Sequence, residues 1–523
     1  MNFRVVWKGK CHEIDESLRH SRSSIDKPEG VSVIRRFTKV ALPLVFAAIG
    51  ALPLHAQVAP GAVQPAQSSS TSSSSSTVSG PAAPQTSQNF QGSVPGQLVP
   101  GVLQISLQDA IDRGLKTNLG LLLSNQDIRA TRGERWKQLS SLLPNLTTTS
   151  YINASQIDLA EYGFNSFPGV SIPSIVGPFA YFDSRAYVTQ SMLDLKAINN
   201  THAATQNVKA TEYTYKDARD LVVLAVGYSY LQAIADASRI ESVSAQVDTA
   251  QALFNQASDQ VNAGTSPKID GLRAEVELKT RQQQLIQAKN DFAIQKLTLG
   301  RVIGLNPAQQ FELTDKSPYA PFTALSVDEA IQQAEASRSD LKSAEASVRA
   351  AQYSKKAARA GYYPTINFSA DYGLAGVYST LNTHGVFDVR GTLSIPIFQG
   401  NRVHGDEMQA DAQLEQARQH YENLRAQVDA DVRTALLNLQ SSSEQVAVAK
   451  SNIDLAQQTL DQSRDRFAAG VADTVEVVQA QEQVASANDS YIASLYSYNY
   501  AKISLARAMG LAEVGVKEYF KGK

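Results

Sequence analysis

The chain has 523 residues, enough for about two to four domains, and 43% of them are hydrophobic. Its 48 Lys and Arg residues are balanced by 50 Asp and Glu residues, which gives a formal net charge of −2. No basic excess points to a nucleic-acid partner, and the single cysteine, Cys11, excludes a disulfide within the chain.

An apolar run at residues 41–56 follows the basic stretch RRFTK, which is the order of a secretory signal peptide. The alternative is a membrane anchor, but the run is shorter than the ~20 residues that a spanning helix needs. We therefore predict a signal region at 1–56 that is removed. Residues 57–101 are rich in Ser and Pro and offer little apolar surface to bury, so they are predicted to form a flexible linker.

Similar segments then recur along the chain at one offset. The segment SLQDAI begins at Ser106 and SVDEAI begins at Ser326, and Pro144 and Pro364 each come directly before a run that reads as a strand. The differences 326 − 106 and 364 − 144 both equal 220. A shared offset at separate places indicates an internal repeat.

A second offset supports the same interpretation. Gly264 and Gly470 lie in similar turns, and Leu305 and Leu511 end the similar segments RVIGL and RAMGL, with a difference of 206 in both cases. We predict a first repeat at 102–305, a second at 306–511 and a tail at 512–523. A chance match between low-complexity helices is the alternative.

Four strands are predicted, two in each repeat. Polar and apolar residues alternate strictly at 365–374 and 387–395, and more weakly at 146–157 and 179–190. This is the pattern and length of a transmembrane barrel strand, and a soluble half-buried sheet shows the same alternation.

The remaining segments are predicted to be helices. Residues 198–263 and 402–469 contain no proline, and about 66 residues of helix span roughly 100 Å. Helices of about half that length are predicted at four places: 107–143, 272–303, 327–363 and 477–509. An ordinary antiparallel helical bundle would also give these patterns.

Any membrane crossing is expected to use the strands, because after residue 56 no apolar run approaches spanning length. Four strands are too few for one chain to close a barrel, since the smallest barrels need about eight. Several chains would have to contribute.

We find no signature of catalysis in the sequence. It contains no phosphate-binding loop or nucleophile elbow, and no histidine after residue 56 lies at metal-ligand spacing from another His or Cys. We therefore predict no enzyme activity, no catalytic residues, no cofactor and no metal.

The repeated unit, the helix-proline-strand junctions at Pro144 and Pro364, the segment SIPIFQGNR at 394–402 and the paired Ala-Gly turns together resemble the TolC-type outer membrane efflux family. The resemblance covers roughly 103–511. It implies a mostly α fold with a membrane β-barrel. Three chains would share a twelve-stranded barrel, with four strands from each, which a long α-helical periplasmic barrel continues.

The resemblance also implies a function and a set of partners. The protein would be a homotrimer in outer-membrane lipid that spans into the periplasm. It would serve as the passive exit duct of a tripartite efflux or type I secretion system. Its partners would be a periplasmic membrane-fusion adaptor and an inner-membrane pump of RND, ABC or MFS type.

The family's functional residues map onto the two helix-helix turns. Gly264, Gly470 and Phe467 would form the periplasmic tip and dock the adaptor, while Asp270 and Glu476 resemble the family's acidic tip residues. In a trimer these acids would give a ring of six carboxylates that attracts cations. Acids near helix N-termini also complement the helix dipole, and both roles remain open.

An alternative to the duct is a soluble periplasmic coiled-coil scaffold or adaptor protein, because it would show the same helical runs. Where some members of the family place a Tyr and an Arg to hold the tip closed, this sequence has Phe467 and Ala472. That closing contact is therefore not expected here.

Overall fold

The computed structural model describes residues 92–163, 173–315, 326–377, 382–513 and 515. The chain divides into two compact units, Met1–Ser76 and Thr77–Lys523, and every described residue belongs to the second. The predicted signal region, 1–56, and most of the predicted linker lie outside the described residues.

The strands and α-helices of the second unit follow one another in the same order twice, and only the short 3-10 helices η2 and η3 differ in position. Up to Val302 they are β1 (Leu103–Ile105), α2 (Leu107–Thr117), α3 (Leu119–Ser140), β2 (Asn145–Asp158), η2 (Leu159–Tyr162), β3 (Ile175–Leu193), α4 (Leu195–Asn262) and α5 (Lys268–Val302). Thereafter they are β4 (Phe311–Leu313), α6 (Val327–Ser337), α7 (Ser339–Arg359), η3 (Ala360–Tyr362), β5 (Thr365–Val377), β6 (Asn382–Ser394), α8 (Arg402–Ala468) and α9 (Thr474–Ala508). The long helices and the four long strands agree with the predicted elements within a few residues at most ends.

The predicted helices at 107–143 and 327–363 are not continuous, which corrects that prediction. Each is broken by one residue with an extended ψ, Asn118 at 128° and Arg338 at 124°. Asn118 is fully buried, and its side chain caps α3 by accepting a hydrogen bond from the amide of Leu121. Neither break is marked by Pro or Gly, so the sequence pattern did not reveal them. The two positions differ by 220 residues, the offset of the predicted repeat.

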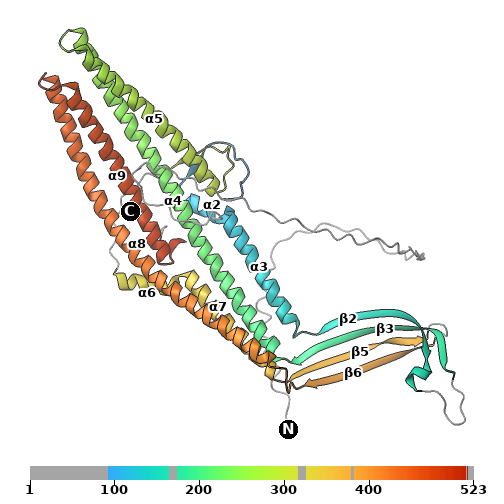
Figure 1. Ribbon diagram of the computed structural model, residues 1–523. Helices are drawn as coiled ribbons and strands as arrows, with labels where there is room; N and C mark the ends of the chain where they lie inside the picture. The colour runs from blue at the N-terminus through green and yellow to red at the C-terminus, as the bar shows by residue number, and fades with distance from the viewer. Residues whose placement is uncertain (1–91, 164–172, 316–325, 378–381, 514, 516–523) are drawn as a thin grey trace, which may run out of the picture. The chain divides into compact units, whose positions relative to one another are not determined.

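The four long strands form one antiparallel sheet in the order β2, β3, β5, β6 (Figure 1). Asn145 pairs with Thr189, and Thr365 pairs with Ser394, so all four junctions with helices lie at one end of the sheet. Within the described ranges β2 and β6 each pair with only one neighbour. Both edges of the sheet therefore have unpaired backbone groups.

A second, smaller sheet was not predicted. Strands β1 and β4 pair in parallel, with Gln104 opposite Glu312, and they pack with α2, α4 and α9 in a hydrophobic cluster. The buried hydroxyl of Tyr230 lies 2.9 Å from a carboxylate oxygen of Asp315 and 3.0 Å from the carbonyl oxygen of Ile105. These contacts tie the two strands to the middle of α4.

Helix α4 is the one helix in the described ranges that is long and apolar enough to cross a membrane. The expectation that no apolar run after residue 56 approaches spanning length is therefore wrong for α4. Within the most apolar window of this helix, 67% of the residues are buried inside the protein. Val222, Val223 and Val226 have no exposed surface and belong to the core cluster, so packing within the chain accounts for the composition.

Charged side chains also pair where α4, α9 and the segment after α9 meet. Arg507 Nη2 lies 2.5 Å from Asp217 Oδ1, and Arg219 Nη2 lies 2.7 Å from Glu513 Oε1. Asp220 is only 8% exposed. Burial raises the pKa of Asp220 to about 6, and the nearby carboxylates of Asp217 and Glu513 add to this effect against the opposing charge of Arg507. The folded chain therefore bears a cost for keeping Asp220 ionised at neutral pH.

We predict that Asp220→Asn stabilises the protein at pH 8 and does so much less at pH 4. The carboxyl titrates near 3.8 when the chain is unfolded and near 6 when it is folded. The cost of ionisation is therefore absent only well below pH 3.8, small at pH 4 and fully present well above pH 6, with an upper limit of about 3 kcal/mol. Thermal unfolding of the detergent-purified protein, followed by circular dichroism at both pH values, measures the difference.

The matched control is Asp248→Asn, on an exposed part of the same helix. It should leave the thermal midpoint unchanged at both pH values. A gain in stability for Asp220→Asn that is equal at pH 4 and pH 8 would show that ionisation of Asp220 is not its cause.

Candidate functional site

The sheet has two chemically different faces. Residues directly opposite each other in antiparallel strands point to the same face, and the observed register places most of the large exposed apolar side chains on one face. Their exposed fractions run from 38% at Ile366 to 75% at Phe387. This apolar face consists of Leu146, Ile152, Ile366, Tyr372, Leu374, Phe387, Val389 and Leu393. A surface of this kind needs an apolar environment.

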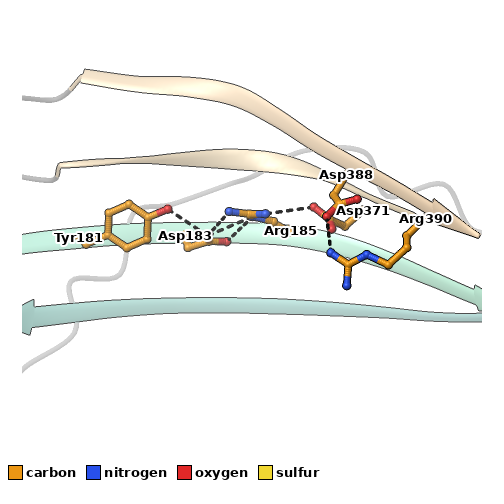
Figure 2. Close-up of polar contacts among 6 residues, drawn as sticks. All are labelled: Tyr181, Asp183, Arg185, Asp371, Asp388 and Arg390. Atoms are coloured by element: carbon orange, nitrogen blue, oxygen red, sulfur yellow. Dashed lines mark hydrogen bonds and ion pairs between the residues drawn. The ribbon is translucent and has the colours of Figure 1, made fainter. Parts of the chain in front are cut away.

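The opposite face has a row of charged side chains, which we call the charged row: Asp183, Arg185, Asp371, Asp388 and Arg390 (Figure 2). Arg185 pairs with Asp183 on its own strand at 2.8 Å and reaches Asp371 on β5 at 3.1 Å. Arg390 pairs with Asp388 on β6 at 2.9 Å. The row contains three carboxylates and two guanidinium groups, and therefore one net negative charge per chain.

The side chain of Arg185 on β3 can reach Asp371 on β5 because the residue directly opposite Arg185 is Gly373. A Cβ at Gly373 would lie 2.1 Å from the carbonyl oxygen of Ser184 and 2.8 Å from Cγ of Arg185. A larger residue would push the two strands apart. Gly373 is thus required both for strand pairing and for the contact between Arg185 and Asp371.

The two prolines singled out from the sequence lie at the junctions between helices and sheet. Pro144 directly precedes the first residue of β2, and Pro364 directly precedes the first residue of β5. Proline cannot donate a backbone hydrogen bond and favours an extended conformation in the residue before it, so it suits the end of a helical run.

The turns after α4 and α8 share one geometry. Gly264 has φ of 73° and Gly470 has φ of 71°, a left-handed conformation that favours glycine. In both turns the glycine amide donates to the carbonyl three residues earlier, Val261 or Phe467. Both turns lie at the ends of their helices away from the sheet.

Phe467 is 5% exposed and packs in a cluster that joins the two turns. The cluster contains Leu253 and Ala257 of α4, Leu460 of α8 and Val477 of α9. The two helical hairpins, α4 with α5 and α8 with α9, are therefore held together near their turns by apolar contacts.

The two acids near the turns occupy equivalent helix positions but differ in exposure. Asp270 lies in the first turn of α5, and its side chain is only 11% exposed. Its carboxylate accepts a hydrogen bond from Ser266 Oγ at 3.1 Å and lies 3.4 Å from Arg273 Nη1. This position also complements the positive end of the α5 dipole.

Glu476 lies in the first turn of α9, and its side chain is 39% exposed. Its carboxylate lies 3.0 Å from Nε of Arg466 on α8, so an ion pair spans the second turn. Asp473 caps the same helix by accepting a hydrogen bond from the amide of Glu476.

Sequence reasoning missed the charged row and the arginine partners of the two acids. Asp183 and Arg185 are two residues apart on one strand, and this spacing alone places them on one face. Asp371 could be added only once the register between β3 and β5 was known. Among the described residues, no group of three or more His, Cys, Asp or Glu side chains is arranged to hold a metal ion.

Comparison with known proteins agrees with this architecture. The model of the family described as "Outer membrane efflux protein" matches residues 111–305 and 330–511. These two segments make up well over half of the chain.

Individual relatives are distant but cover most of the chain. The pyoverdine export outer membrane protein OpmQ of Pseudomonas aeruginosa is 23% identical over 402 residues, which cover 74% of this chain and 83% of OpmQ. The outer membrane protein TolC of Escherichia coli is 22% identical over 341 residues, which cover 62% of this chain and 68% of TolC.

Solved structures show the same fold. The crystal structure of the outer membrane protein VceC from Vibrio cholerae aligns with a TM-score of 0.65 and 18% sequence identity, and covers 77% of this chain and 96% of VceC. The family match and these relatives do not support the alternative of a soluble periplasmic adaptor. The chain belongs to the outer membrane efflux protein family, whose members are efflux channels and not enzymes, and it is an outer-membrane exit duct that extends into the periplasm.

Proposed function

We propose that three copies of this chain form a homotrimer whose sheets join edge to edge into one twelve-stranded barrel. The observation that carries the proposal is a four-stranded sheet with one apolar face, one charged face and two unpaired edges. In hydrocarbon every backbone group must find a partner within the protein. Because the smallest barrels need about eight strands, the missing partners would come from other copies.

The orientation of the sheet follows from its two faces. The apolar face would meet lipid, and the charged row would line the interior. In a trimer the row would contribute nine carboxylates and six guanidinium groups at one level of the barrel. Substrates would then cross an interior with excess negative charge.

The helices would continue the barrel as a periplasmic tunnel. Helices α4 and α8 contain 68 and 67 residues, so each is roughly 100 Å long. The prolines Pro144 and Pro364 would mark the level at which the helical wall becomes the membrane wall.

We also propose that the chain arose by internal duplication, with repeats at 102–305 and 306–511 and a tail at 512–523. Ser106 and Ser326 each begin a helix with a capping box, and they differ by the same 220 residues as the helix breaks at Asn118 and Arg338. The order of strands and helices supports the same division.

The partners are proposed from the family resemblance. A periplasmic membrane-fusion adaptor would dock at the turns around Gly264 and Gly470, and an inner-membrane pump of RND, ABC or MFS type would supply the substrate. Phe467 is buried, so it would support docking by holding the turns together. Val471, which is 69% exposed beside Gly470, would offer contact surface.

The acids Asp270 and Glu476 are proposed to form an acidic ring of six carboxylates at the tip of the trimer. Their arginine partners, Arg273 and Arg466, bring an equal number of positive charges to the tip. The ring would therefore set ion preference through the balance of both signs.

We predict that Val389→Lys sharply lowers the amount of assembled protein in the outer membrane. Val389 is 61% exposed on the apolar face, and Lys on the lipid face near the bilayer centre costs about 2–4 kcal/mol per chain. The assay is outer-membrane fractionation followed by electrophoresis of unheated samples, which resolves trimer from monomer.

The matched control is Val386→Lys, the same substitution on the same strand at a position that the register places on the polar face. It should assemble nearly as well as the wild type. Equal assembly of the two variants would contradict the proposed orientation of the sheet. Exclusively monomeric wild-type protein would contradict the trimer.

We predict that the double variant Asp270→Ala with Glu476→Ala loses preference for cations in planar-bilayer conductance. The substitutions remove six carboxylates from the trimer and leave six arginines without their partners, so the reversal potential in a salt gradient should shift toward anions.

Additional Arg273→Ala and Arg466→Ala substitutions provide the control, because they restore charge neutrality at the tip. The fourfold variant should show ion preference intermediate between the wild type and the double variant. A reversal potential that stays at the wild-type value in the double variant would eliminate the ring.

A further inference from the structure

Near the sheet the helices lie side by side in the order α3, α4, α7, α8, which follows the order of the strands (Figure 1). Helices α4 and α7 have a neighbour on both sides, whereas α3 and α8 lie at the two edges of this layer. The chain runs along α3 toward the sheet and along α8 away from it. The two edge helices are therefore the places where another molecule could extend the layer.

Both edge helices have a glycine followed three residues later by a large exposed side chain. On α3 these residues are Gly133 and Trp136, and on α8 they are Gly405 and Met408. Trp136 is 61% exposed and Met408 is 62% exposed. Residues three apart lie on one face of a helix, so each edge has a bare position beside a bulky side chain.

Packing within the described part of the chain does not explain either glycine. A Cβ at Gly133 or at Gly405 would lie within 4 Å of no neighbouring element, whereas a Cβ at Gly114 would lie 2.6 Å from a methyl carbon of Val226. Glycine inside a helix is less stable than alanine, because it loses more backbone freedom on folding. The open space beside the two edge glycines therefore suits a close approach from outside the chain.

The contact between α4 and α7 shows how a pair of such helices meets. The ring of His202 on α4 stacks on Tyr353 of α7 with the centroids 5.2 Å apart, and Ser343 Oγ on α7 donates to the carbonyl oxygen of Ala210 on α4 at 2.9 Å. Higher numbers on one helix pair with lower numbers on the other. The two helices are therefore antiparallel, with a defined register.

In the proposed repeats, α8 is the equivalent of α4, and α3 is the equivalent of α7. Met408 is the equivalent of His202, since 408 − 202 equals the offset of 206. Gly133 is the equivalent of Tyr353, since 353 − 133 equals the offset of 220. If α8 met α3 of another copy as α4 meets α7, Met408 would lie opposite Gly133.

We propose that α8 of one copy packs against α3 of the next copy, with Met408 over Gly133 and Trp136 over Gly405. The antiparallel register places the second pair opposite each other, because each partner moves three residues in opposite directions. Each bulky side chain then fills the space beside a glycine, as a knob fills a hole. The inference rests on the proposed trimer and repeats, and it extends the contact between copies from the strands to the helices.

A second copy of this chain is the occupant that the fold favours. In the proposed barrel, β6 of one copy pairs with β2 of the next. Helix α8 follows β6, and α3 comes directly before β2, so pairing of these strands brings the same two helices together. The matched positions of the two glycines and the two bulky side chains support this partner over lipid or an adaptor.

Disulfide cross-linking in the full chain tests the contact, in a background where the native cysteine is removed by Cys11→Ser. Gly133→Cys with Met408→Cys should link neighbouring copies, and Trp136→Cys with Gly405→Cys should do the same. Both pairs would be close enough for the ~5.5 to 6 Å between Cα atoms that a disulfide needs. Oxidised samples should run as covalent dimers and trimers on a denaturing gel without reducing agent.

The matched control is Gln126→Cys with Met408→Cys, which moves the cysteine on α3 by two turns, or about 10 Å, along the same face. It should give no covalent dimer, and cross-linking as strong as in the matched pairs would contradict the register. Matched variants that form trimers on unheated gels but no covalent dimers would overturn the helix contact and leave the trimer intact. Wild-type protein that is monomeric on such gels would overturn both.

An exchange of side chains provides a second measurement that needs no cysteine. Gly133→Met places two methionines where there is space for one, so it should lower the temperature at which the trimer dissociates by about 5 °C or more, although methionine favours a helix over glycine. Adding Met408→Gly should recover at least half of this loss. An unchanged dissociation temperature in Gly133→Met would show that no second copy approaches this face, and would refute the contact.

Discussion

The sheet in this protein is constrained by the unpaired backbone at its two edges. Strands β2 and β6 each have one neighbour among the described residues, and the face between them exposes large apolar side chains. Unpaired amides are tolerated in water, whereas exposed apolar side chains are tolerated in lipid. One chain cannot satisfy both requirements, and this conflict makes assembly with other copies part of the proposed structure.

The polar face meets a different constraint, because in the proposed barrel its charges would line an enclosed interior. Asp183 is nearly buried, with its side chain 3% exposed, and Arg185 is placed so that it compensates Asp183 and Asp371 together. The absence of a side chain at Gly373 allows this arrangement. Packing and electrostatics in the sheet are therefore linked through a single glycine position.

The helices are bounded by local caps and breaks, and they are held to one another by contacts between distant residues. Capping at Ser106 and Ser326 begins short helices that Asn118 and Arg338 then end. Farther along, the hairpins are joined by an apolar cluster near the turns.

The sequence by itself determined the long helices, the four strands and the positions of Pro144 and Pro364, because periodicity and proline act locally. It also identified Asp270 and Glu476, but not Arg273 and Arg466 as their partners. Only the tertiary structure decided the helix breaks at Asn118 and Arg338 and the contact between Arg185 and Asp371. These features depend on residues far apart in the chain, whose register and burial no local pattern encodes.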